Sequence, residues 1–146
     1  MIERITNNGA ELAIILRRNY EQSGLKFFTE NAATMQLGYM NRPAGYVIQP
    51  HIHRPVQRET HYTEEVLFVR SGRVRVDFFS DEQAYLQSAI LEAGDVVLLA
   101  RGGHGFEMLA PTEMIEVKQG PYVGDRDKER FEIPAGNKVS GRRDQP

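Results

Sequence analysis

The sequence predicts an all-β fold, a sandwich or barrel, and three observations support this prediction. Between residues 25 and 119, Gly, Pro, Asn and Asp recur at short intervals and leave few windows long enough for a helix. Several of the segments between them alternate apolar with polar residues, which is the period of a half-buried strand. No repeat, heptad or low-complexity tract indicates another architecture. A chain of 146 residues is the right size for one such domain.

Eight strands are expected in the central part of the chain. The clearest is the segment 74–79, where apolar residues from Val74 to Phe78 alternate with charged ones. Ser71-Gly72 before it predicts a tight turn and a hairpin. In chain order, the expected strands cover residues 35–40, 46–48, 66–69, 74–79, 85–91, 95–99, 106–109 and 114–118.

The last of these strands can face the core in two ways. Met114, Glu116 and Lys118 share one face, and Ile115 and Val117 share the other. We expect the apolar pair to face inward, although Met114 fits either face because its side chain is flexible and apolar.

Residues 1–30 are expected to form an extra N-terminal strand or helix packed on a barrel that covers residues 31–134. Asn8 followed by Glu11 could cap a helix that runs to Ser23. The continuous apolar run 12–16 suits a buried strand equally well, and we favour the strand slightly. Residues 135–146 contain no aromatic residue and are predicted to be a flexible tail.

Composition excludes several classes of site. The chain has no cysteine, so a disulfide framework, a thiolate nucleophile and an iron–sulfur cluster are impossible, and any metal must bind His, Asp or Glu. A net charge of −2 favours neither nucleic acid nor a membrane surface as partner. The first twenty residues lack a signal-like apolar segment, so we expect a cytoplasmic protein.

Three of the four histidines suggest a metal site. Residues i and i+2 of a strand project from the same face, so both imidazoles of His51-Ile52-His53 could bind one ion. Glu65 opens an expected strand, and His104 follows a glycine-rich turn. Both are ligands suited to a divalent metal.

These residues lie in two motifs that resemble those of the cupin superfamily. The first runs from Gly45 through His51-Ile52-His53 and Glu65 to Gly72, and the second runs from Gly94 to His104. The loop 54–64 is longer than is usual in the family. The resemblance implies a jelly-roll barrel, or double-stranded β-helix, in which His51, His53, Glu65 and His104 bind one divalent metal. Because imidazole and carboxylate ligands discriminate weakly, we expect iron or manganese first, and zinc or nickel next.

Other polar residues are candidates for substrate binding and catalysis near the mouth of the barrel. Arg54, Arg58 and Arg101 could bind an anionic substrate. His61 and Glu116 are candidate bases. On a straight strand His61 would lie roughly 13 Å from Glu65, too far to share an ion, so we place it at the rim.

The function expected from these features is that of an enzyme. The chain is similar to cupins encoded among surface-polysaccharide or nucleotide-sugar genes, which suggests a small, polar, carbohydrate-derived substrate. Two open positions on an octahedral ion would let the metal act as a Lewis acid, in an isomerase, epimerase or oxygenase reaction. The alternative is a non-catalytic sensor that binds a sugar or another small ligand. Apolar stretches at 12–16 and 25–28 suggest a homodimer.

Overall fold

The structure is a computed structural model that describes residues 1–133, so the tail expected at 135–146 lies outside the described residues. The all-β prediction is confirmed, since these residues form ten strands with antiparallel pairing and one short 3-10 helix. No helix in residues 1–133 is long and apolar enough to cross a membrane. The elements are β1 (Ile2–Asn7), β2 (Ala10–Leu16), β3 (Gly24–Phe27), β4 (Gly38–Asn41), β5 (Glu65–Ser71), β6 (Arg73–Phe79), β7 (Tyr85–Glu92), β8 (Val96–Leu99), β9 (Gly103–Met108), β10 (Glu113–Lys118) and η1 (Gly124–Asp127).

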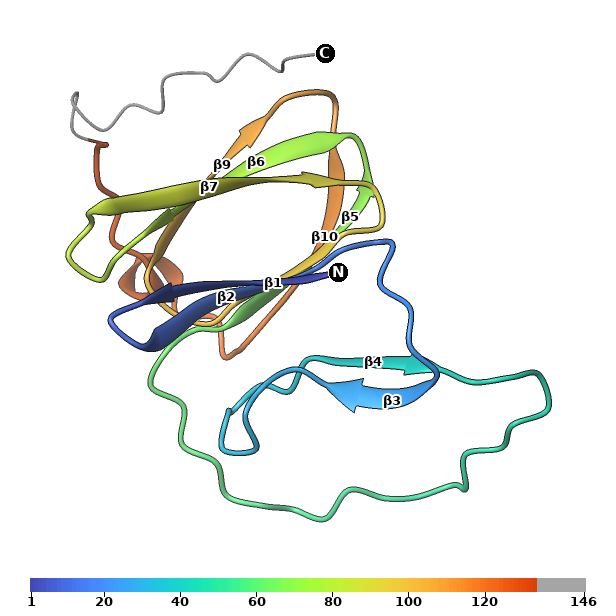
Figure 1. The fold of residues 1–146 in the computed structure, drawn as a ribbon. Helices are drawn as coiled ribbons and strands as arrows, with labels where there is room; N and C mark the ends of the chain where they lie inside the picture. The colour runs from blue at the N-terminus through green and yellow to red at the C-terminus, as the bar shows by residue number, and fades with distance from the viewer. Residues whose placement is uncertain (134–146) are drawn as a thin grey trace.

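Two sheets form the body of the molecule (Figure 1). One has five strands in the order β1-β2-β8-β5-β10, and the other has three in the order β7-β6-β9. Their facing sides enclose the main core, to which both sheets contribute buried aliphatic side chains and Phe78. Burial of each such side chain stabilises the fold by ~1.5–3 kcal/mol. The described strands make separate sheets, which hydrogen bonds do not close into a barrel.

The N-terminal segment forms two strands within the larger sheet, and the helical alternative is wrong. Asn8 and Gly9 both have positive φ, at 49° and 80°, which is the backbone of a tight hairpin turn rather than of a helix cap. The apolar run of β2 is explained by burial on both faces. Ile15 contributes to the core between the sheets, and Ile14 contributes to a second cluster on the outer face.

The predicted hairpin at Ser71-Gly72 is also wrong. β5 pairs with β8 and β10, whereas β6 pairs with β7 and β9, so the chain passes from one sheet to the other at Gly72. Gly72 has a φ of +83° at this corner. The bend was predicted correctly, but the partners of the two strands were not.

The facing of β10 differs from the sequence prediction. Met114 packs against the core between the sheets, and Lys118 lies near the buried Glu65. Ile115 and Val117 are therefore on the outer face, where they are 47% and 52% exposed. The outer face of this edge strand is apolar and open to solvent.

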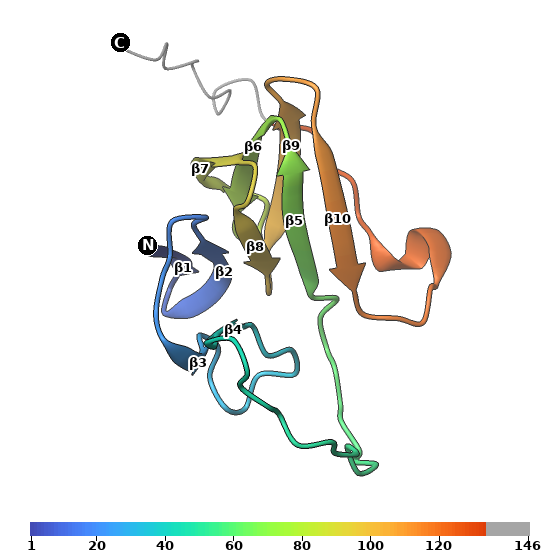
Figure 2. The same cartoon turned by 90° about the vertical axis from the view of Figure 1, so that its right-hand side faces the viewer.

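The hairpin β3–β4 covers part of the outer face of the larger sheet. Phe28 and Leu37 beside it pack with Ile14, Val66 and Leu98 in the second buried cluster. The strand expected at 46–48 does not form, and residues 42–64 contain neither strand nor helix. Figures 1 and 2 both show this connection running well away from the two sheets before it returns to β5.

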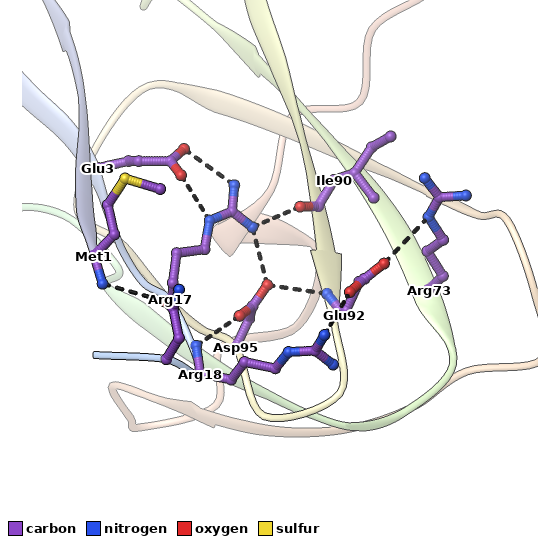
Figure 3. A network of polar contacts seen from close by, with 9 residues as sticks. Met1, Glu3, Arg17, Arg18, Arg73, Ile90, Glu92 and Asp95 are labelled. Carbon is purple, nitrogen blue, oxygen red and sulfur yellow. Dashed lines mark hydrogen bonds and ion pairs between the residues drawn. The ribbon is translucent and has the colours of Figure 1, made fainter. Parts of the chain in front are cut away.

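A polar network joins the N-terminal hairpin to the turn between β7 and β8 (Figure 3). Arg17 donates to Glu3 at 2.7 and 3.0 Å, to the carbonyl of Ile90 at 2.6 Å and to Asp95 at 2.9 Å. Asp95 is buried and also accepts from the backbone N–H groups of Arg18 and Glu92, at 2.8 and 3.1 Å. The network fixes the turn from which β8 starts.

Candidate functional site

A cavity of about 810 Å³ opens beside the start of β9 and the start of β5. Its walls come from five parts of the chain: the end of the 42–64 connection, β5, the end of β6, the residues around β9, and the segment 123–133 that contains η1. The lining combines charged side chains with aromatic rings. It includes His61, Tyr62, Glu65, Phe79, Arg101, His104, Phe106, Asp127, Lys128 and Phe131.

Glu65 is the buried acidic group of this cavity, with 4% of its surface exposed. It shares the inner face of β5 with Leu67 and Val69, which are in the core, as the alternation of the strand predicted. The neighbouring Glu64 points to the opposite face, where Thr34 donates to its carboxylate. The alternation of the strand therefore places the carboxylate of Glu65 in the cavity and that of Glu64 outside it.

His104 is the partner of Glu65. Its Nε2 lies 3.2 Å from Oε2 of Glu65, and it comes from β9 in the opposite sheet. The hydrogen bond from His104 is the largest cause that lowers the pKa of Glu65, and the nearby ammonium groups of Lys128 and Lys118 lower it further. Together these effects outweigh burial, which raises that pKa, so Glu65 is a carboxylate at neutral pH.

Two lysines and a second acid surround this pair. Lys118 Nζ lies 3.9 Å from Glu65 Oε1 and 3.6 Å from Asp127, and Lys128 Nζ lies 3.8 Å from Glu65 Oε1. Thr63 donates to Asp127 at 2.5 Å, and this bond is the main cause that lowers the pKa of Asp127. The buried carboxylate of Glu65 thus has two ammonium groups nearby, one from β10 and one from the residue that follows η1.

The structure brings together only two of the four predicted metal ligands. Glu65 and His104 meet in the cavity, whereas His51 and His53 lie on the exposed connection with their rings 5.2 Å apart. A divalent ion needs its ligand atoms within ~2.0–2.6 Å. No group of three or more His, Asp or Glu in residues 1–133 meets that requirement. The ligand set implied by the cupin resemblance therefore does not fit a single chain in this conformation.

Of the residues predicted to bind substrate or act in catalysis, some line the cavity and others do not. His61 and Arg101 line the cavity, and Arg101 is paired with Asp81 at 2.5 Å and lies over the ring of Tyr62. His61 has a side chain that is 73% exposed, which agrees with a position at the rim.

The other three candidates lie elsewhere. Arg54 and Arg58 are on the exposed connection, and neither lines the cavity. Glu116 is exposed on β10 and contacts Lys118 at 3.9 Å without lining the cavity.

Several lining residues were not predicted from the sequence. Asp127 is the last residue of η1, and Lys128 and Phe131 follow it in the chain. Phe131 packs edge-on against Phe79 with ring centroids 5.1 Å apart. This segment carries no motif, and only its return to the mouth of the cavity gives it a role. Comparison of the chain with protein-family models, with curated proteins and with solved structures gives no match.

Proposed function

We propose that this protein is a cupin-like enzyme that moves a proton on a small, polar, carbohydrate-derived substrate bound in the cavity. The observation that carries the proposal is the contact between a buried carboxylate, Glu65, and the imidazole of His104 at the cavity wall. A base whose orientation is fixed by a second group is the usual arrangement in proton-transfer sites.

In this proposal His104 is the acid–base group and Glu65 is its positioning residue. The ring nitrogen of His104 that does not face Glu65 takes a proton from the substrate and returns it. The imidazolium formed in between is stabilised by the carboxylate 3.2 Å away. Such a sequence suits an isomerase or epimerase, because the substrate neither gains nor loses electrons overall.

The lining supports a polar ligand that carries negative charge. Arg101, Arg126, Lys128 and Arg130 border the cavity, against Glu65, Asp127 and Glu129. Aromatic rings from Phe79, Phe106 and Phe131 offer apolar surfaces on the same walls. A few polar groups among apolar surfaces are typical of small-molecule sites.

The test is incubation of the protein with nucleotide sugars and small oxo-acids in D₂O. We expect one of them to take up deuterium at carbon, followed by NMR. His104→Gln should slow that exchange ~10²–10⁴-fold, because it removes the acid–base group. Gln87→Ala, a change at an exposed position on β7 outside the lining, is a control for general damage.

A variant at the mouth of the cavity tests whether His104 and not His61 transfers the proton. His61→Ala should change the exchange rate less than ~10-fold, since a rim residue does not handle the proton. Equal loss in His61→Ala and His104→Gln would contradict the assignment. Tight binding of a sugar nucleotide without exchange or product would instead identify a sensor.

A further inference from the structure

Neither edge strand of the smaller sheet, β7 or β9, has a second strand beside it among the described residues, and the β9 edge lies at the cavity. Among the described residues β9 pairs with β6, and no strand pairs with its other side. Phe106 and Met108 on this strand are 37% and 50% exposed. An open, partly apolar edge offers unpaired backbone groups to another strand.

The connection 42–64 contains a segment suited to that edge. Every residue from 42 to 63 is exposed, including Val47, Ile48 and Ile52, the last at 92%. If residues 46–53 were extended, His51 and His53 would share one face, and Ile48 and Ile52 would share the other. Pro50 is tolerated in such a strand because it would be an edge strand.

The apolar surface left open is larger than this segment alone could cover. Leu25, Phe27 and Met40 are exposed on the hairpin from which the segment departs, at 43%, 49% and 48%. Both views of the ribbon show the segment leaving from the end of the hairpin and running away from the two sheets (Figures 1 and 2). Folding the segment back onto its own β9 would leave the hairpin bare, whereas a second copy would cover the hairpin as well.

We propose that two copies of this chain exchange residues 46–53, each adding this segment as a strand to β9 of the other. Exchange of an identical element is a low-cost route to a two-fold symmetric dimer. This inference retains the expected homodimer but changes its basis. The run 12–16 is buried within its own sheet, so it needs no partner, and the exchanged segment lies further along the chain.

The inward face of the added strand would carry His51 and His53 of one copy past Glu65 and His104 of the other. The exchange itself rests on the open edge of β9 and on the exposed segment 46–53, and the proton transfer proposed for His104 does not depend on it.

The decisive test uses engineered cysteines, because the native chain has none. Ile52 and Gly105 are expected to be neighbours across the new pairing, and a Cβ at Gly105 would meet nothing closer than Phe79, at 4.0 Å. Ile52→Cys and Gly105→Cys chains are mixed, unfolded, refolded together and oxidised. We expect covalent dimers that join the two variants. The control replaces Gly105→Cys by Gln87→Cys on β7, at the far edge of the same sheet, and should give none.

Three results would overturn the exchange. One is light scattering that gives a monomer near 16.6 kDa at micromolar concentration. Another is a dimer in which the 52–105 mixture cross-links no more than the control does. The third is a chain with both cysteines that closes the disulfide only within itself.

Cross-linked dimers that show no deuterium exchange would reject the proposed enzyme and leave the exchange standing.

Discussion

Replacement of Asp95 by alanine is expected to lower the free energy of unfolding by about 3 kcal/mol. Asp95 is 4% exposed and accepts from the Arg17 guanidinium and from two backbone N–H groups, those of Arg18 and Glu92. Alanine removes all three hydrogen bonds at once. The two N–H groups lose their acceptor, while Arg17 keeps Glu3 (Figure 3).

Urea denaturation followed by fluorescence or circular dichroism measures this effect. Glu92→Gln is the matched control, because its carboxylate is about half exposed and its ion pairs with Arg18 and Arg73 are 3.3 and 3.8 Å long. An exposed pair of this kind contributes ~0–1 kcal/mol. Equal losses in the two variants would show that the burial of Asp95 is not what makes it important.

Replacement of Gly72 by alanine is expected to destabilise the protein by about 2–5 kcal/mol, the sum of two costs. The first is the left-handed backbone, since φ is +83°. The second is steric, because a Cβ there would overlap the carbonyl oxygen of Pro111 and lie 2.6 Å from Thr112 Oγ1. The loop between β9 and β10 leaves no room for a methyl group at the corner where the chain changes sheets.

Gly9→Ala separates these two costs. Gly9 has nearly the same φ, +80°, but a Cβ added there would have no atom within 4 Å, so only the ~1–2 kcal/mol backbone cost applies. Thermal or urea unfolding of both variants gives the difference. If Gly72→Ala lost no more stability than Gly9→Ala, the close approach of the Pro111 loop would be refuted.

Local pattern was sufficient for most strands. Alternation located β6 and β7. The strand predicted at 95–99 matches β8, and both end at Leu99. β1 and β3 were missed, because β1 shows no regular alternation of apolar and polar residues and β3 is only four residues long. The signal that would have found β1 is the Asn8-Gly9 pair, which is a favoured hairpin turn.

The same reasoning shows where local pattern stops. A turn residue such as Gly72 specifies that the chain bends, but whether the strands on either side pair depends on which other strands compete for their edges. The facing of β10 was decided by contacts too. Met114 packs against the core on the inner face of β10, and Lys118 on the same face lies 3.9 Å from the buried carboxylate of Glu65. A count of apolar residues on each face does not include this ion pair.

The sequence by itself determined an all-β chain without thiol chemistry and selected Glu65 and His104, residues of two separate motifs that meet at 3.2 Å. Strand alternation placed Glu65 on the inner face of its strand, whereas His104 was selected, together with His51 and His53, from the two motifs that resemble those of cupins. Tertiary structure alone decided that Lys118, Asp127 and Lys128 surround the pair, and that His51 and His53 lie apart from it. Those placements depend on the paths of long connections between strands. The path of such a connection is set by its contacts with the rest of the folded chain, and local sequence pattern does not specify those contacts.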